Sequence, residues 1–127
     1  MKYFLISIIS IFIITNAYSQ QVDVNTLKKD PIMIEYKKVF NELKEASISR
    51  KYKLPNDPNL QKEIAANPSK EGMIKVLKEK GMINADEYVN KIFLQNSLMF
   101  QFLKKHPEIT KLNQNKKMEV FGKLLED

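Results

Sequence analysis

The sequence predicts an all-α protein: a small compact bundle of about five helices without disulfide bonds, preceded by a cleavable signal peptide. Apolar residues recur every three or four positions over most of the chain instead of alternating with polar ones. Only three glycines and five prolines interrupt the 127 residues, and no hairpin turn separates two apolar runs. Cysteine is absent, so the apolar core alone has to stabilise the fold, and 43% hydrophobic residues are enough to build one.

The first part of the chain predicts an export signal. Lys2 precedes an apolar run over residues 3–14, and small residues follow where a signal peptidase would cut. We therefore expect residues 1–19 to be removed and the protein to be secreted or periplasmic. The expected cleavage region consists of Ala17, Ser19 and Gln20.

An uncleaved membrane anchor is the alternative interpretation of this segment. The apolar run is shorter than the roughly 20 residues that a spanning helix needs, and Ser7 and Ser10 interrupt it. We therefore expect no stable membrane anchor after cleavage. Without cysteine, attachment through a lipid-modified cysteine is excluded as well.

The remaining sequence predicts a flexible lead-in over residues 20–29 and one helical domain over residues 30–127. The first strong helix is expected to begin at Asp30 and Pro31, an N-cap acceptor followed by proline at the first helical position, and to end near Lys51. At about 100° per residue, its apolar side chains fall on one face and its charged side chains on the other. The apolar face comprises Ile32, Tyr36, Val39, Phe40, Leu43 and Ala46.

Prolines and a glycine divide the middle of the chain. Residues 54–59 contain two prolines and break the helical pattern. A short helix is predicted over residues 58–66, and Ser69 is expected to cap the next one. That helix should end at Gly81, which adopts the left-handed conformation of a helix stop without steric cost.

The longest and most apolar helix is predicted over residues 85–104. Asn84, with Glu87 three positions later, is typical of a capping box. A short turn over residues 107–112 and a terminal helix over residues 116–125 complete the predicted fold. Short connections favour antiparallel packing of neighbouring helices, with the long helix at the centre.

The charge balance favours partners other than nucleic acid. The net charge is +6, but among the 21 basic residues only Arg50 is an arginine, the side chain that binds phosphates and base edges through two hydrogen bonds. Residues 50–53 place Tyr52 among basic residues, as single-stranded nucleic-acid binders do. So short a match has little weight, and basic residues are favoured at a helix C-terminus in any case.

No catalytic, cofactor-binding or metal-ligating motif is present in the sequence. His106 is the only histidine, and its place before Pro107 predicts a helix junction more than a general base. Carboxylates could still act in pairs on a glycosidic bond, but Glu35, Glu42 and Glu45 belong to the charged face of their helix. We therefore expect no cofactor, no metal and no catalytic residue.

The long helix supplies the candidate binding residues. Asn96 is predicted to lie within its apolar stripe, where an amide either fixes helix packing or orients a ligand in a cavity. Leu94 and Leu98 are predicted to face away from the stripe, and the surplus of aromatic and methionine side chains could line a pocket or a groove. The candidate partner or ligand surface is Leu94, Asn96, Leu98 and Phe102.

These observations favour a non-enzymatic protein-interaction or binding module that acts in the periplasm or outside the cell. A carrier of a small apolar ligand, held in a cavity between helices, is the alternative. A cell-wall or polysaccharide hydrolase is the least favoured reading, because the sequence offers no carboxylate among apolar neighbours on its own helix face.

Overall fold

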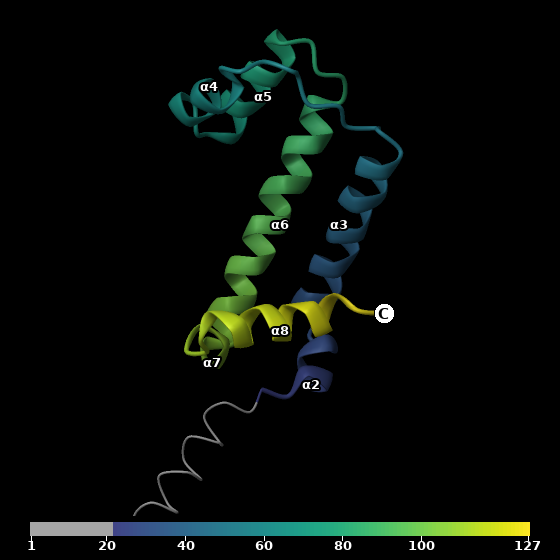
Figure 1. Ribbon diagram of the computed structural model, residues 1–127, viewed down its shortest axis with the longest axis vertical. Helices are drawn as coiled ribbons and strands as arrows, with labels where there is room; N and C mark the ends of the chain where they lie inside the picture. The colour runs from purple at the N-terminus through teal and green to yellow at the C-terminus, as the bar shows by residue number, and fades with distance from the viewer. Residues whose placement is uncertain (1–21) are drawn as a thin grey trace, which may run out of the picture.

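The computed structural model describes residues 22–127, which are 73% helical and contain no strand. The predicted all-α class is therefore confirmed for this part of the chain. These residues form seven helices where about five were expected (Figure 1). The two additional helices are short and comprise residues 24–28 and 107–110. The helices are α2 (Val24–Lys28), α3 (Pro31–Ile48), α4 (Leu60–Ala66), α5 (Lys70–Glu79), α6 (Ala85–Lys105), α7 (Pro107–Thr110) and α8 (Gln114–Leu125).

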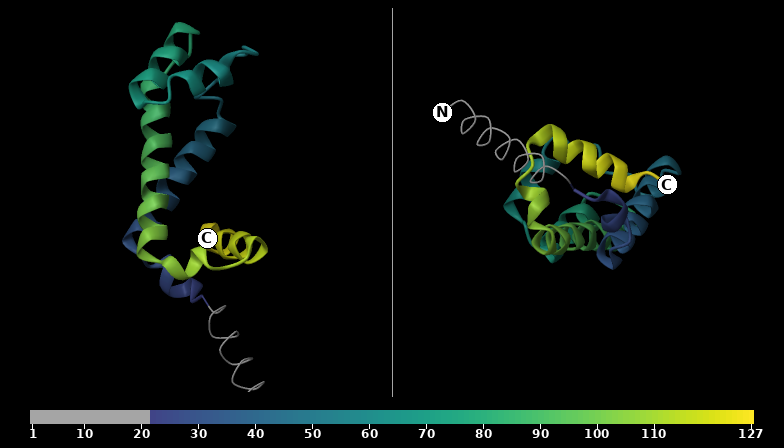
Figure 2. Two further views of the ribbon diagram at one scale, coloured as in Figure 1. Left: turned by 90° about the vertical axis from the view of Figure 1, so that its left-hand side faces the viewer. Right: turned by 90° about the horizontal axis from the view of Figure 1, so that it is seen from below.

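The two longest helices form an antiparallel pair that carries the others at its ends. α3 and α6 lie side by side, with α4 and α5 at one end and α2, α7 and α8 at the other (Figure 1). In the side view, α4 and α8 both project from α6 toward the same side (Figure 2). The shape is therefore elongated, and the central part of the helix pair has few neighbours.

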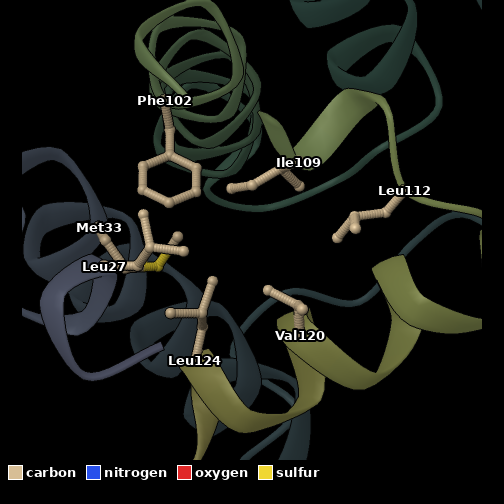
Figure 3. Close-up of a cluster of buried hydrophobic side chains, with 7 residues drawn as sticks. All are labelled: Leu27, Met33, Phe102, Ile109, Leu112, Val120 and Leu124. Carbon is tan, nitrogen blue, oxygen red and sulfur yellow. The ribbon is translucent and has the colours of Figure 1, made fainter. Parts of the chain in front are cut away.

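The core is divided in the same way into two clusters. Figure 3 shows one of them, in which Phe102 points from α6 toward side chains of α2, α3 and α8. This first cluster consists of Leu27, Met33, Phe102, Ile109, Leu112, Val120 and Leu124. The second, where α5 packs on α6, consists of Leu60, Val76, Leu77, Met82, Ala85 and Val89.

Two of the predicted helix starts are present and a third differs. The side chain of Asp30 accepts a hydrogen bond from the Ile32 N–H, and that of Ser69 from the Gly72 N–H, as their sequence signals predicted. Asn84 makes no such bond and has a left-handed backbone with φ of 61°. The expected capping box at the start of α6 is therefore wrong, because the Asn84 backbone is used to turn the chain.

Helices α3 and α5 both end in a Schellman motif, in which a residue with a left-handed backbone follows the helix and the next N–H donates to a carbonyl five positions earlier. The left-handed residue differs between the two helices. After α5, Gly81 has φ of 82° and the Met82 N–H donates to the Leu77 carbonyl at 3.0 Å. After α3, the Lys51 N–H donates to the Ala46 carbonyl at 2.9 Å, but the left-handed residue is Arg50 with φ of 59°. The end at Gly81 confirms the prediction, whereas the end at Arg50 had no glycine to indicate it.

Replacing Arg50 with glycine should stabilise the protein. A non-glycine residue in the left-handed region costs roughly 1–2 kcal/mol, while glycine loses more backbone entropy on folding, so Arg50→Gly is expected to gain about 0.5–1 kcal/mol. Urea denaturation followed by circular dichroism measures the change. Gly81→Ala is the opposite substitution in the same motif and should lose about 1 kcal/mol. A loss of stability in Arg50→Gly would contradict this account.

The described residues of the expected lead-in form part of the folded domain. Residues 24–28 are the helix α2, in which Leu27 is 4% exposed and belongs to the first cluster. Val22 and Val24 also pack against this cluster, so these residues contribute to the same core as the helices that follow. The predicted signal peptide and cleavage region, including Ala17, Ser19 and Gln20, lie outside the described residues. Within residues 22–127, no helix is both long and apolar enough to cross a membrane.

Candidate functional site

Two of the four predicted surface residues are buried. Leu98 is 8% exposed and Phe102 is fully buried, although both were expected on a partner or ligand surface. Phe102 lies in the first cluster, and its ring packs 4.7 Å from the His106 ring. Both side chains are therefore covered within the folded chain, which the pattern of α6 alone could not indicate.

The other two predicted residues are on the surface but do not share a face. Leu94 is 43% exposed and Asn96 is exposed as well, not buried in the apolar stripe as predicted. Two positions along a helix differ by roughly 200°, so these side chains leave α6 in nearly opposite directions. Phe100, one turn beyond Asn96, is 70% exposed. The four predicted residues therefore do not form one site.

A different set of residues lines a cavity between the central helices. Its volume is about 340 Å³, within the range of small-molecule sites, and it lies between the C-terminal half of α3 and the N-terminal half of α6. Side chains from α3, from α6 and from the loop after α3 form its wall, which is mostly apolar and aromatic. The lining residues are Phe40, Leu43, Lys44, Ser47, Tyr52, Leu54, Tyr88, Ile92 and Gln95.

The loop that closes one end of this cavity is held by ion pairs on both sides. Lys51 donates to the Glu87 carboxylate at 2.7 Å, which joins the start of the loop to α6. At the other end of the loop, Lys80 contacts Asp57 at 2.6 Å and Glu63 at 2.9 Å. Mutual hydrogen bonding lowers the pKa of Asp57 and raises that of Lys80, so both charges persist at neutral pH.

An aromatic pair forms the wall where the loop meets α6. The rings of Tyr52 and Tyr88 lie 5.4 Å apart and tilted, and both pack against the second cluster. The basic neighbours of Tyr52 in the sequence suggested a ring available for stacking on bases. The structure shows that its ring packs on the protein itself, and only its aromatic character in a polar loop could have indicated this.

The Tyr52 hydroxyl is buried without a geometrically satisfactory hydrogen bond within residues 22–127. Burial raises the pKa of Tyr52, and the neighbouring carboxylate of Glu87 raises it further. On the same side, Lys91 forms ion pairs with Glu42 at 3.1 Å and with Glu87 at 3.7 Å. Glu42 of the charged face of α3 is therefore ion-paired with a lysine across the helix pair.

Removing the Tyr52 hydroxyl should cost no stability. A buried hydroxyl without a partner is unfavourable, so Tyr52→Phe is expected to leave the free energy of unfolding unchanged or to raise it by up to about 1 kcal/mol. Thermal unfolding measured by calorimetry tests this. Tyr88→Phe is a control in the same aromatic pair, with no such buried hydroxyl. A loss above about 1 kcal/mol for Tyr52→Phe alone would show that the hydroxyl bonds to Glu87.

The only histidine joins two helix ends through a buried aspartate. His106 Nε2 lies 2.6 Å from Asp30 Oδ2, and Lys105 Nζ lies 2.9 Å from the same oxygen. Burial alone would raise the pKa of Asp30, but hydrogen bonds from Lys105, His106 and the Ile32 N–H lower it to about 2. This arrangement supports the junction role predicted for His106.

A second cavity of about 450 Å³ lies between α3 and the last residues of α8. Lys28 and Lys37 line it, and both donate to the Glu126 carbonyl. Lys37 also pairs with Asp127 at 3.2 Å. Contacts within the chain therefore already use these polar groups, which makes the α3 and α6 cavity the stronger candidate. Among the residues that the structure describes, no group of histidine or carboxylate side chains could hold a metal ion.

The fold and this cavity define the molecule only as a small all-helical protein with a half-open apolar pocket. Comparisons with protein-family models, with curated proteins and with solved structures find no match to the chain. Its function is therefore argued from its own residues.

Proposed function

We propose that this protein is a non-enzymatic binding protein that holds a small apolar ligand in the cavity between α3 and α6. The cavity is the observation that carries this proposal, because it combines apolar walls with a few polar groups at a volume that suits a small molecule. It favours the ligand carrier over the protein-interaction module, since the residues expected to form a partner surface are partly buried or point apart.

The chemistry of the lining supports binding over catalysis. The lining residues include no aspartate, glutamate or histidine, the most frequent general acids and bases, and their titratable groups are Lys44, Tyr52 and Tyr88. Glu42 and Glu87 lie nearby, but both are engaged by Lys91. A hydrolase that uses paired carboxylates is therefore less well supported than a carrier.

The proposed place of action is the periplasm or the exterior of the cell. This part of the proposal rests on the sequence of residues 1–19, in which one lysine precedes an apolar run and small residues at the expected cleavage site. N-terminal sequencing of the protein purified from its own host tests it. A mature chain that starts at Gln20 is expected, and an intact Met1 would contradict export by cleavage.

A neutral fluorescent probe tests the binding function. N-phenyl-1-naphthylamine should bind with a blue-shifted emission and a Kd of roughly 10–100 μM, the range expected for an apolar molecule of this size. Ser47→Trp places a large side chain at the mouth of the cavity from an exposed position, so it should block the probe while the fold is kept. Binding weakened at least about tenfold is expected.

The matched control is Ser97→Trp, an exposed serine of α6 that does not line the cavity. This variant should bind the probe as the original protein does. If the original protein fails to bind, or if both tryptophan variants bind equally well, the α3 and α6 cavity is not the ligand site.

A further inference from the structure

We propose that the ligand is an amphiphile with an anionic head, such as an alkyl or aromatic carboxylate, whose head group pairs with Lys44 at the mouth of the cavity. This inference rests on the proposed binding function and specifies the class of ligand. The cavity wall is apolar and aromatic, and Lys44 is the one charged residue that lines it.

Lys44 has no ionic partner within the part of the chain that the structure describes. Helix neighbours three or four positions away are the usual partners of an exposed lysine. Those neighbours of Lys44 on α3 are Phe40, Asn41, Ser47 and Ile48, none of them a carboxylate. The ammonium group is therefore available to a bound anion.

Other lysines near the cavity differ from Lys44 in this respect. Lys51 pairs with Glu87, Lys91 pairs with Glu42 and Lys80 pairs with Asp57. Their charges are compensated by the protein, so they add little attraction for a ligand. The uncompensated charge among the lining residues thus lies at the open side, where an anionic head would remain hydrated.

The geometry of the mouth suits a ligand with two chemically different ends. Lys44 is exposed, so its aliphatic stem can extend along the apolar wall while its ammonium group stays in water. Ser47 lies one turn further along the same side of α3, and Gln95 faces the cavity from α6. These two groups can hydrogen-bond to carboxylate oxygens while the apolar part of the ligand contacts Leu43 and Ile92.

Three ligands with the same chain length and different head groups test the inference: decanoate, 1-decanol and decyltrimethylammonium. Their affinities are measured by displacement of N-phenyl-1-naphthylamine from the full-length protein in low salt. Decanoate is expected to bind about threefold to fivefold more tightly than decanol, the fold-change of an exposed charge pair, and the cation more weakly than decanol. Added salt should reduce the difference.

Lys44→Met keeps the length of the stem and removes the charge. Decanoate and decanol should then bind about equally, with decanol binding unchanged. Lys38→Met is the control, because Lys38 is an exposed lysine of the same helix that does not line this cavity. It should retain the preference for decanoate.

The outcomes separate this inference from the function on which it rests. Equal binding of decanoate and decanol to the original protein, or a preference that survives Lys44→Met, overturns the anionic head group while the apolar carrier stands. A preference for decyltrimethylammonium also overturns it. If neither decanoate nor decanol displaces the bound probe, the ligand class is wrong while the apolar carrier stands, whereas failure of the probe itself to bind overturns the proposed function.

Discussion

Phe102→Ala is expected to destabilise the protein by about 3–5 kcal/mol, the range for removing a buried aromatic ring from a core. The Phe102 side chain is fully buried in the first cluster and reaches from α6 toward Leu27, Met33 and Leu124, which lie on three other helices (Figure 3). The remaining cavity would adjoin four helices, α2, α3, α6 and α8. Because natural domains have only about 5–15 kcal/mol of stability, this loss should be visible at once.

Guanidinium denaturation followed by far-ultraviolet circular dichroism measures the effect, with two comparison variants on the same helix. Leu98→Ala should lose about 2–4 kcal/mol, because Leu98 is 8% exposed. Leu94→Ala should change stability by no more than about 0.5 kcal/mol, because Leu94 is 43% exposed and lies in neither cluster. A loss of less than about 1 kcal/mol in Phe102→Ala would mean that the first cluster does not hold the helices together.

The sequence predicts the helices of this protein well because their signals are local. Asp30 and Ser69 are followed by helices whose N–H groups they cap, and Gly81 supplies a left-handed helix end. Each of these signals depends on one residue and its immediate neighbours. After α3 the left-handed residue is Arg50, and because arginine does not favour this conformation, the sequence does not indicate the helix end there.

The candidate site could not be predicted in the same way, because burial on α6 depends on two different neighbours. Near its start, Ala85 and Val89 lie in the second cluster, where α5 packs on α6, while near its end Phe102 lies in the first cluster. The covered side therefore changes along the helix, and Asn96 lies where neither neighbour reaches. A single straight apolar stripe, which a helical projection assumes, is a poor description of such a helix.

The sequence did not predict the cavity either, because its wall depends on how separate elements pack together. Its wall combines Phe40 and Leu43 of α3 with Ile92 of α6 and with Tyr52 and Leu54 of a loop. The sequence indicated the apolar faces of both helices, but a periodic pattern cannot show that the loop after α3 turns back over their junction. Ion pairs between residues far apart in the chain, such as the 2.7 Å contact of Lys51 with Glu87, hold it there.

Asp30→Ala is the second substitution with a large expected effect, a loss of about 2–4 kcal/mol at neutral pH. The Asp30 carboxylate caps α3 through the Ile32 N–H at 2.8 Å and also accepts hydrogen bonds from Lys105 and His106. Loss of an N-cap costs about 1 kcal/mol and the bond from the half-buried His106 is worth roughly 1.5–3 kcal/mol, while the Lys105 side chain is exposed and adds little. Denaturant unfolding at pH 7 measures the sum.

The pH dependence of stability separates the charge of Asp30 from its role as a cap. Asp30→Asn keeps a side-chain acceptor for the Ile32 N–H but cannot ionise, so it should lose the charge-dependent part, about 2 kcal/mol at pH 7. The pKa of Asp30 is about 2 in the folded protein, below its usual 3.8, so this contribution is present above about pH 4 and lost as the pH falls toward 2. The difference in unfolding free energy between Asp30→Asn and the original protein should therefore shrink between pH 5 and pH 2. A difference that stays constant over this range would assign the effect of Asp30 to packing instead of charge, and the junction between α3 and α6 would not depend on the ionised carboxylate.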